Sequence, residues 1–326
     1  MTPRALDEDD VRIRPGRGTR PRTRKRPAYA DAVPAFVIAV DRGRWTCRLG
    51  ADGSGAEVMA TRGGDLRRTP VVVGDVVDLV GDLTGATDAI ARMVRLAPRR
   101  SLLARTPDDT ETHEKPVVAN ADVLVVVAAL TEPPPQPRLI DRCLVAAYAG
   151  GLEPVLVLTK DDLADADDRD LRAMYEPLGI PVLTQAPDRP LDPLIDLIAG
   201  RIAVFFGSSG VGKSTLVNRL VTTADQATGG VSGVGKGRHT TSAAVAIELP
   251  AGGWIADTPG VRSLGLGGVT TAAVIAAFPD LVEATEHCPP GCDHVSPGCA
   301  LDNPEVVEDP DPARLASLRR LLTLRG

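Results

Sequence analysis

The hydrophobic positions of this chain follow two different patterns, one before and one after residue 100. Between residues 34 and 95, short apolar runs are separated by clusters of Gly and Asp. This spacing is typical of strands joined by turns in a small all-β domain. The number and length of the runs predict a five-stranded β-barrel of the OB type over residues 33–97.

The second pattern consists of longer, nearly continuous apolar runs. These runs are ADVLVVVAAL at 121–130, EPVLVLTK at 153–160 and RIAVFFG at 201–207. Parallel strands that are covered on both faces have this character. Stretches with helical spacing lie between the runs, at 138–150 and 167–179, and each ends in Gly, a common helix C-cap. We therefore predict a doubly wound α/β domain over residues 116–269.

Two further segments complete the organisation. Residues 98–115 are polar and show no apolar periodicity, so we predict a linker or flexible loop there. The chain is helical in pattern from residue 270, then rich in Cys, then helical again from 311 to 324. This order predicts a small helical domain over residues 270–326.

Composition is that of an ordinary soluble protein, with 326 residues, 43% hydrophobic and 25% charged. No apolar run approaches the roughly 18 residues that cross a bilayer. The acidic residues 7–10 leave no room for the apolar region of a signal peptide. We therefore expect a cytoplasmic protein.

The net charge of -6 conceals a basic segment near the N-terminus. Residues 11–26 contain eight Arg or Lys and no acid. Such a run cannot bury apolar surface, so we predict that residues 1–32 form a disordered arm that contacts nucleic-acid phosphates. A solubilising tail is the alternative interpretation. In the barrel, only Phe36 and Trp45 offer aromatic surface, which favours contact with an RNA backbone over base stacking.

The sequence GSSGVGKS has the spacing of a phosphate-binding loop. It follows the apolar run at 201–207 and precedes a helical stretch, which is the context this loop requires. Lys213 would reach the β- and γ-phosphates of a nucleotide, and Ser214 would ligate Mg²⁺. A glycine-rich turn with no ligand is the alternative. The predicted binding residues are Gly207, Ser208, Ser209, Gly210, Val211, Gly212, Lys213, Ser214 and Thr215.

Base recognition is predicted where the run at 153–160 ends. The tetrapeptide TKDD resembles the guanine motif Asn-Lys-x-Asp, with Thr in place of Asn. Its last carboxylate, Asp162, would accept the N1 and N2 hydrogens of guanine, a paired contact that adenine cannot make. A solvated helix start is the alternative. The predicted base-binding residues are Thr159, Lys160, Asp161 and Asp162.

The tetrapeptide DTPG at 257–260 has the form of a nucleotide-sensing switch. Asp257 would hold Mg²⁺ through water, and the Gly260 N–H would meet the γ-phosphate. A plain turn is the alternative. The Gly-rich segment 233–242 would be the first switch, and either of two hydroxyls there could ligate Mg²⁺. These candidates are Thr240 and Thr241.

The order of these motifs is unusual, because the guanine motif precedes the phosphate-binding loop instead of ending the domain. A circular permutation explains this order, since moving the chain ends leaves the sheet intact. The chain then passes from the DTPG switch directly into the C-terminal segment, which would be tied to the nucleotide state.

Zinc binding is predicted in that C-terminal segment. The spacing Cys-x3-Cys-x-His-x4-Cys supplies three thiolates and one imidazole, a complete tetrahedral set for one structural Zn²⁺. His287 is a competing ligand, and idle buried residues are the alternative. The predicted ligands are Cys288, Cys292, His294 and Cys299.

These features together resemble the circularly permuted GTPase family of ribosome small subunit-dependent GTPase A (RsgA, also called YjeQ). The resemblance extends from about residue 33 to 324 and rests on the motif order and the zinc segment. It implies a monomeric GTPase that binds the small ribosomal subunit late in assembly, contacts its rRNA and leaves upon GTP hydrolysis. An RsgA-type protein normally has Ser-Ala behind the guanine; here the corresponding pair is Gln185-Ala186.

One residue points to assisted catalysis. Val261 follows DTPG, where many GTPases carry a Gln that orients the attacking water. Intrinsic hydrolysis should then be slow, and His239 on the first switch could orient water once the ribosome orders that loop. Contact of His239 with an rRNA phosphate is the alternative. The predicted catalytic residues are Lys213, His239 and Gly260.

Two other functional classes compete with this interpretation. One is a GTPase of large-subunit assembly, because permuted motifs occur there too. The other is an RNA-binding switch in which GTP hydrolysis is incidental. A P-loop ATPase is disfavoured by TKDD.

Overall fold

The computed structural model describes residues 29–105, 115–165, 170–228, 244–257, 264, 270–303 and 312–323. The chain divides into two units, residues 1–31 and residues 32–326. The predicted basic arm, up to residue 28, lies outside the described residues. Within the part that is described, no helix is both long and apolar enough to cross a lipid bilayer.

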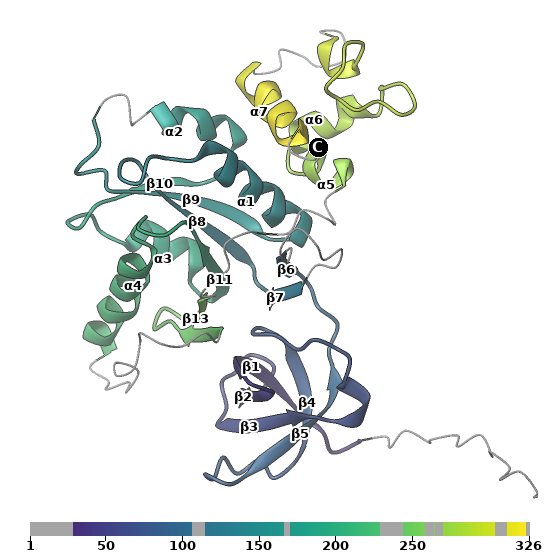
Figure 1. Ribbon diagram of the computed structural model, residues 1–326, viewed down its shortest axis with the longest axis vertical. Helices are drawn as coiled ribbons and strands as arrows, with labels where there is room; N and C mark the ends of the chain where they lie inside the picture. Colours follow the sequence, from purple (N-terminus) through teal and green to yellow (C-terminus); the bar gives the residue numbers. More distant parts are fainter. Residues whose placement is uncertain are drawn as a thin grey trace, which may run out of the picture. The chain divides into compact units, whose positions relative to one another are not determined.

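The first domain is a closed five-stranded barrel, as predicted (Figure 1). The strands run in the order β1-β2-β3-β5-β4, and β4 pairs with β1 again to close the barrel. All pairs are antiparallel except β3 with β5. The strands are β1 (Val33–Asp41), β2 (Arg44–Leu49), β3 (Glu57–Arg62), β4 (Val76–Gly81) and β5 (Ile90–Leu96).

Alternating side chains of these strands fill the inside of the barrel. Val77 and Leu79 on β4 and Ala91 and Met93 on β5 are fully buried in one cluster, whose other buried members all lie between residues 35 and 79. Period-two burial is what a half-buried strand requires. The indole of Trp45 packs in this core and donates to the Val71 carbonyl at 3.0 Å. The barrel therefore has a hydrophobic core made of its own residues.

The second domain is built on a mostly parallel sheet, as predicted for an α/β fold. Its strand order is β10-β9-β8-β11-β13-β12, and only β12 runs antiparallel to its neighbour β13. The strands are β8 (Val123–Ala129), β9 (Glu153–Thr159), β10 (Val182–Gln185), β11 (Arg201–Phe206), β12 (Val245–Glu248) and β13 (Gly253–Asp257).

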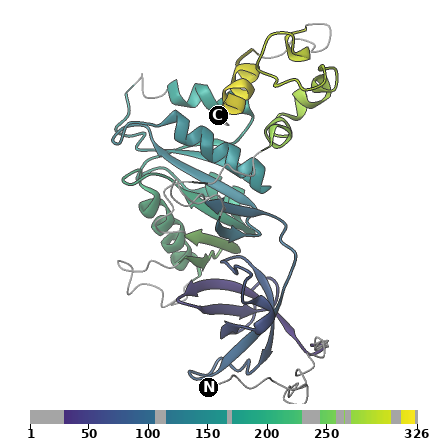
Figure 2. The same ribbon diagram turned by 45° about the vertical axis from the view of Figure 1, so that its right-hand side comes forward.

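Helices cover both faces of this sheet (Figures 1 and 2). On β8, Leu124 and Val126 pack in one core with α1, whereas Val123 and Val125 pack in another core with α3 and α4. This explains why the strand has no polar face in sequence. The helices are α1 (Pro137–Gly150), α2 (Asp170–Tyr175), α3 (Asp192–Ile198) and α4 (Lys213–Thr228).

The segment predicted as a linker contains regular structure. Strand β6 (Leu102–Arg105) lies inside it and pairs with β7 (Lys115–Ala119). Leu103 is buried, and its register partner Val118 is fully buried. Four residues are too few to show a periodicity, so the strand could not be recognised from its sequence alone.

The barrel and the sheet meet at strand β12. Ala39 of β1 is the register partner of Val245, so one sheet runs through both domains. Beside this pairing, the rings of Phe36 and Trp254 lie 5.2 Å apart between centroids. Arg48 of the barrel forms an ion pair with the carboxylate of Glu248.

The C-terminal segment is helical, as predicted, and packs against the second domain. Its helices are α5 (Thr271–Ile275), α6 (Pro279–Thr285) and α7 (Pro312–Thr323). Phe278 and Leu318 are fully buried in the same cluster as Leu144 of α1 and Tyr175. This segment therefore shares a hydrophobic core with the domain before it.

Candidate functional site

The predicted phosphate-binding loop lies between β11 and α4, the strand–loop–helix arrangement that the motif requires. Gly207 sits so close to the Val127 carbonyl that a Cβ atom would come within 2.4 Å of its oxygen. Gly212 adopts a φ of +90°, in the left-handed region that favours glycine. Helix α4 begins at Lys213, so its unpaired N–H groups open onto the loop. This is a suitable environment for an anion.

Lys213, which is predicted to contact phosphate, lies near Asp257, which is predicted to hold Mg²⁺. The Lys213 ammonium is 3.4 Å from a carboxylate oxygen of Asp257, at the end of β13. Ser214 is exposed in the first turn of α4. A hydroxyl and a carboxylate are oxygen donors of the kind that Mg²⁺ prefers, so these residues fit the ion they are predicted to hold.

The guanine motif is joined to the phosphate-binding loop through its first residue. The Thr159 hydroxyl lies 2.6 Å from the Val211 carbonyl oxygen and 3.2 Å from that of Ala128. Thr159 is buried, and the fixed side chain holds the two motifs side by side. Thr159 stands where the guanine motif usually has Asn. Its hydroxyl is a donor, so it links the guanine motif to the phosphate-binding loop.

A cavity of about 280 Å³ lies beside the rest of the motif. Asp162 lines it and is exposed, whereas Lys160 donates to the Glu132 carbonyl. We call this space the Asp162 cavity. Its lining residues are Thr159, Lys160, Asp162, Leu163, Gln185, Ala186, Pro187, Gly212, Thr215, Leu216 and Arg219.

Asp161 has a different environment from Asp162. Its side chain is buried, pairs with the Arg189 guanidinium and lines a neighbouring cavity of about 300 Å³. A buried carboxylate requires such a partner, because desolvation of an unpaired charge is costly. The structure thus separates two adjacent residues that the sequence grouped together.

Ala186 lines the Asp162 cavity and carries a backbone N–H that is available as a donor. The Gln185 carbonyl accepts from the Asp161 N–H at 3.3 Å. Since the peptide is planar and trans, the Ala186 N–H points the opposite way. Among the described residues this N–H has no hydrogen-bond partner, although Ala186 is buried and lines the cavity. Gln185 and Ala186 both line this cavity, and their contact with a guanine base stays a prediction.

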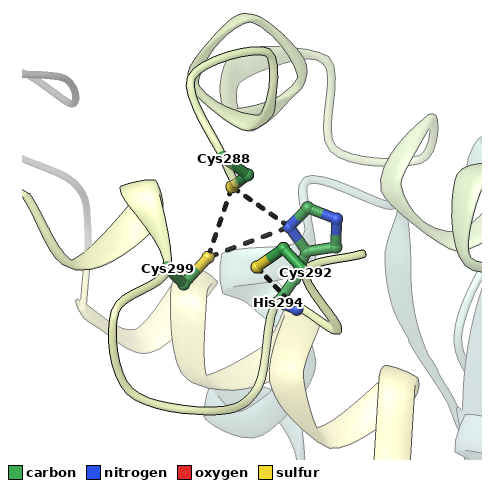
Figure 3. Close-up of side chains that lie close together, drawn as sticks. All are labelled: Cys288, Cys292, His294 and Cys299. Carbon is green, nitrogen blue, oxygen red and sulfur yellow. Dashed lines mark hydrogen bonds between the residues drawn. The ribbon is translucent and has the colours of Figure 1, made fainter. Parts of the chain in front are cut away.

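The predicted zinc ligands come together in the C-terminal segment (Figure 3). Their four donor atoms all lie within 4.8 Å of one another. Cys288 Sγ is 3.6 Å from Cys299 Sγ and 3.5 Å from His294 Nδ1. Tetrahedral ligation with Zn–S bonds near 2.3 Å separates sulfurs by about 3.8 Å, so the cluster is compatible with zinc. His287 is not among the converging residues.

Local contacts fix the turn that carries these ligands. Asp293 accepts from the backbone N–H groups of Val295 and Ser296 and from the Ser296 hydroxyl. These bonds lower the pKa of Asp293 to about 2. Burial raises the pKa of the Cys299 thiol to about 12, so a metal must displace a proton there. Arg319 of α7 donates to the His294 carbonyl at 3.4 Å.

Several predicted site residues lie outside the described part of the chain. They belong to the two switches and to the position after DTPG. These residues are His239, Thr240, Thr241, Gly260 and Val261.

Two arginines near the Asp162 cavity were not singled out from the sequence. Arg219 donates to the carbonyls of Ala186 and Arg189, and Arg189 contacts Asp161. Their partners are 28 to 33 residues away along the chain, so no local pattern could indicate them.

Comparison with known proteins decides the family. The sequence model of the RsgA GTPase matches residues 96–267, more than half of the chain. The protein belongs to the RsgA GTPase family. As an RsgA GTPase it is a GTP hydrolase that uses a guanine nucleotide with Mg²⁺.

Curated relatives extend the match beyond the GTPase domain. A protein of Pseudomonas aeruginosa called small ribosomal subunit biogenesis GTPase RsgA is 41% identical over 244 residues, covering 72% of this chain and 70% of the relative. A protein of Alcanivorax borkumensis with the same name is 38% identical over 282 residues, covering 83% and 78%.

Solved structures support the fold. YjeQ from Thermotoga maritima matches with a TM-score of 0.65 at 24% identity, covering 90% of this chain and 99% of the other. YloQ, described as a circularly permuted GTPase, matches with a TM-score of 0.64, also at 24% identity, covering 91% and 96%.

Proposed function

We propose that this RsgA GTPase binds the small ribosomal subunit and couples GTP hydrolysis to late maturation of that subunit and to its own release. The observation that carries the proposal is the 41% identity to a relative named for small-subunit biogenesis. The order of domains supports it, because a barrel and a Cys-His cluster flank the GTPase domain on either side of the sequence. Under this proposal both flanking domains contact the rRNA of the subunit.

Within the nucleotide site, the base lies in the Asp162 cavity. Asp162 accepts the N1 and N2 hydrogens of guanine, and the Ala186 N–H donates to its 6-oxo group. Lys213 and the N–H groups at the start of α4 bind the phosphates. Ser214 and Asp257 hold Mg²⁺, which neutralises charge that develops on the phosphates. Two observations support this arrangement: the Ala186 N–H has no partner among the residues that the structure describes, and Asp162 is exposed.

Hydrolysis is proposed to need assistance from the ribosome. Val261 has no group that orients water, so His239 supplies it in the complex with the subunit. Under this proposal His239→Ala lowers ribosome-stimulated kcat by about 100-fold with little change in GTP affinity, the pattern of a group that acts only in the transition state. A loss of ribosome affinity with full turnover at saturating subunits would instead make His239 a docking residue.

The ribosome proposal is tested by GTP turnover with isolated small subunits, isolated large subunits and no ribosome. We expect stimulation by small subunits alone. Equal stimulation by large subunits, or none by either, would contradict the proposal while leaving the GTPase assignment untouched. Lys213→Ala serves as the control, because it removes the phosphate-binding ammonium in all three conditions.

The base contact is tested by Asp162→Asn. An amide at this position donates where guanine also donates, so GDP binding should weaken and xanthosine diphosphate binding should strengthen. Isothermal titration with both nucleotides measures the exchange. If Asp162→Asn binds GDP as tightly as the parent protein, the Asp162 cavity does not receive guanine through this carboxylate.

A further inference from the structure

We infer that Arg219 is a positioning residue for guanine selectivity: its guanidinium holds residues 186–190 in the place where the Ala186 N–H meets the 6-oxo group. We call these residues the 186–190 loop. The inference rests on the proposed function, namely that guanine occupies the Asp162 cavity. It concerns a different residue from Asp162 and a different atom of the base, the 6-oxo oxygen instead of the N1 and N2 hydrogens.

Arg219 reaches the loop from the helix that follows the phosphate-binding loop. Its two terminal nitrogens donate to different carbonyls, at 3.0 Å to Ala186 and at 2.7 Å to Arg189. Arg219 also lines the Asp162 cavity itself. It lies within two turns of Lys213 on α4, so one rigid helix positions both the phosphate site and the loop.

The loop is held from its other side by Arg189. The Arg189 guanidinium donates to the Thr184 hydroxyl at 2.9 Å and forms an ion pair with the Asp161 carboxylate. Asp161 is the variable residue of the guanine motif, and its backbone N–H bonds the Gln185 carbonyl. The loop is therefore fixed between the phosphate-side helix and the guanine motif.

These contacts direct the polar groups of Ala186. Its carbonyl already accepts from Arg219 and, at 3.2 Å, from the Arg189 N–H. Of the two backbone polar groups of Ala186, the N–H is the one that has no partner among the described residues. Ala186 lines the cavity. A 6-oxo group accepts from this N–H, whereas the 6-amino group of adenine presents a donor against a donor. Placement of this one N–H thus discriminates between the two purines.

Holding the loop before the nucleotide arrives lowers the cost of binding. A surface loop that must be ordered on binding loses conformational entropy, and that loss reduces affinity. Arginine suits the task better than lysine, because its planar fork donates to two carbonyls at once. Without it, the loop should keep its sequence but lose the fixed orientation of the N–H.

The test compares three nucleotides on full-length protein. GDP and inosine diphosphate carry the 6-oxo group, and ADP does not. Arg219→Met keeps an unbranched apolar stem but is shorter than arginine and removes both donors. We expect its affinity for GDP and for inosine diphosphate to fall by about tenfold each, roughly the worth of one well-placed hydrogen bond. The affinity for ADP should not change.

Two further variants keep the result interpretable. Thr222→Ala is the matched control, because the Thr222 hydroxyl bonds only backbone carbonyls of its own helix, those of Asn218 and Arg219, and leaves the Arg219 guanidinium in place. Its nucleotide affinities should equal those of the parent. Arg219→Lys keeps the charge but cannot form the fork, so it should lose about threefold for the two 6-oxo nucleotides alone. If Arg219→Met does not fold, this pattern in Arg219→Lys decides the question.

Three results would overturn the inference. These are unchanged GDP affinity in both Arg219 variants, an equal loss for ADP, or an equal loss in Thr222→Ala. Asp162→Asn distinguishes a failure of this inference from a failure of the proposed function, because it tests guanine binding independently of Arg219. If that variant shifts toward xanthosine diphosphate while the Arg219 variants bind GDP normally, guanine occupies the cavity and only the role of Arg219 is wrong. If the parent binds ADP as well as GDP, the base assignment itself fails.

Discussion

The barrel and the C-terminal segment are both small domains that flank the GTPase domain in sequence, yet they are stabilised differently. The barrel encloses a core made of its own residues, such as Val77, Leu79 and Met93. In the C-terminal segment, Phe278 and Leu318 belong to a cluster that also contains residues of α1. The segment also carries the four converging side chains of the Cys-His cluster.

The difference shows how a short segment compensates for a small core. A segment of fifty-odd residues buries little apolar surface and is marginally stable alone, so a metal or a neighbouring domain commonly adds stability. The barrel closes its sheet around a core of its own residues. We therefore expect damage to the barrel core to stay local, whereas damage to the C-terminal segment should reach α1.

The largest effect should follow removal of the metal. Cys299→Ser removes one of four converging ligands, and a structural zinc site contributes on the order of 10 kcal/mol to folding of small domains. Elemental analysis should show loss of one zinc per chain, and hydrogen exchange should show lost protection from about residue 280 to 303. GTP binding and barrel protection should persist. Purified parent protein without zinc would contradict this prediction.

The next effect is expected from the shared core. Phe278→Ala removes a fully buried ring and should cost about 3–5 kcal/mol. Because Phe278 packs in one cluster with Leu144, hydrogen exchange should accelerate in α1 as well as in α7. Faster exchange confined to residues 270–323 would mean that the two regions are energetically independent.

A matched substitution in the barrel core should destabilise a smaller part of the protein. Leu79→Ala opens a cavity in the barrel core and should lower the free energy of unfolding by about 2–4 kcal/mol. Urea unfolding followed by tryptophan fluorescence measures this loss. The affinity for GDP and exchange in α1 should equal those of the parent; altered nucleotide affinity would show that the barrel core supports the GTPase site.

The smallest effect concerns one ion pair between α7 and α1. Arg320 Nε lies 3.0 Å from a carboxylate oxygen of Asp141, which is almost fully buried. Burial raises the pKa of Asp141 in spite of this neighbour. Arg320→Met leaves a buried carboxylate unpaired and should cost about 2 kcal/mol at pH 7, less than for a fully buried pair because Arg320 is partly exposed.

The pH dependence of that variant follows from the raised pKa. When a carboxyl group has a higher pKa in the folded than in the unfolded state, the folded protein loses stability as pH rises above the unfolded pKa. The deficit of Arg320→Met should therefore shrink as pH falls from 7 toward 4, which thermal unfolding across that range can follow. Asp141→Asn carries no charge and should cost under about 1 kcal/mol at either pH. A deficit that grows in acid would show that desolvation of Asp141 is not its cause.

Much of the fold could be predicted because it depends on local patterns. The barrel strands alternate, and β8, β9 and β11 are nearly continuous apolar runs, as strands covered on both faces require. The phosphate-binding loop and the Cys-His spacing are local as well, so their positions could be read from short stretches. Strand β6 was missed because its four residues owe their structure to a partner across residues 106–114.

The candidate site could be predicted less completely. The positions of Asp162 and Lys213 follow from motifs, but the separation of Asp161 from Asp162 depends on Arg189, which sequence does not place. The contacts of Arg219 could not be predicted from the sequence either, because an arginine on a helix is usually exposed to solvent. Contacts between distant residues are set by packing of the whole domain, and a single sequence carries no direct signal of them.

Strand β12 has a consequence for any attempt to study the GTPase domain alone. Its outer side pairs with β1, and the Trp254 ring packs on Phe36, so the barrel covers both. A chain that began after residue 97 would expose β12 as an edge strand with unpaired N–H and C=O groups. The Trp254 indole beside it would lose its contact with Phe36 and be exposed to solvent. Such edges pair with other chains, so the shortened protein should self-associate in proportion to its concentration. The boundary that the sequence draws between the first two domains is therefore a poor place to cut.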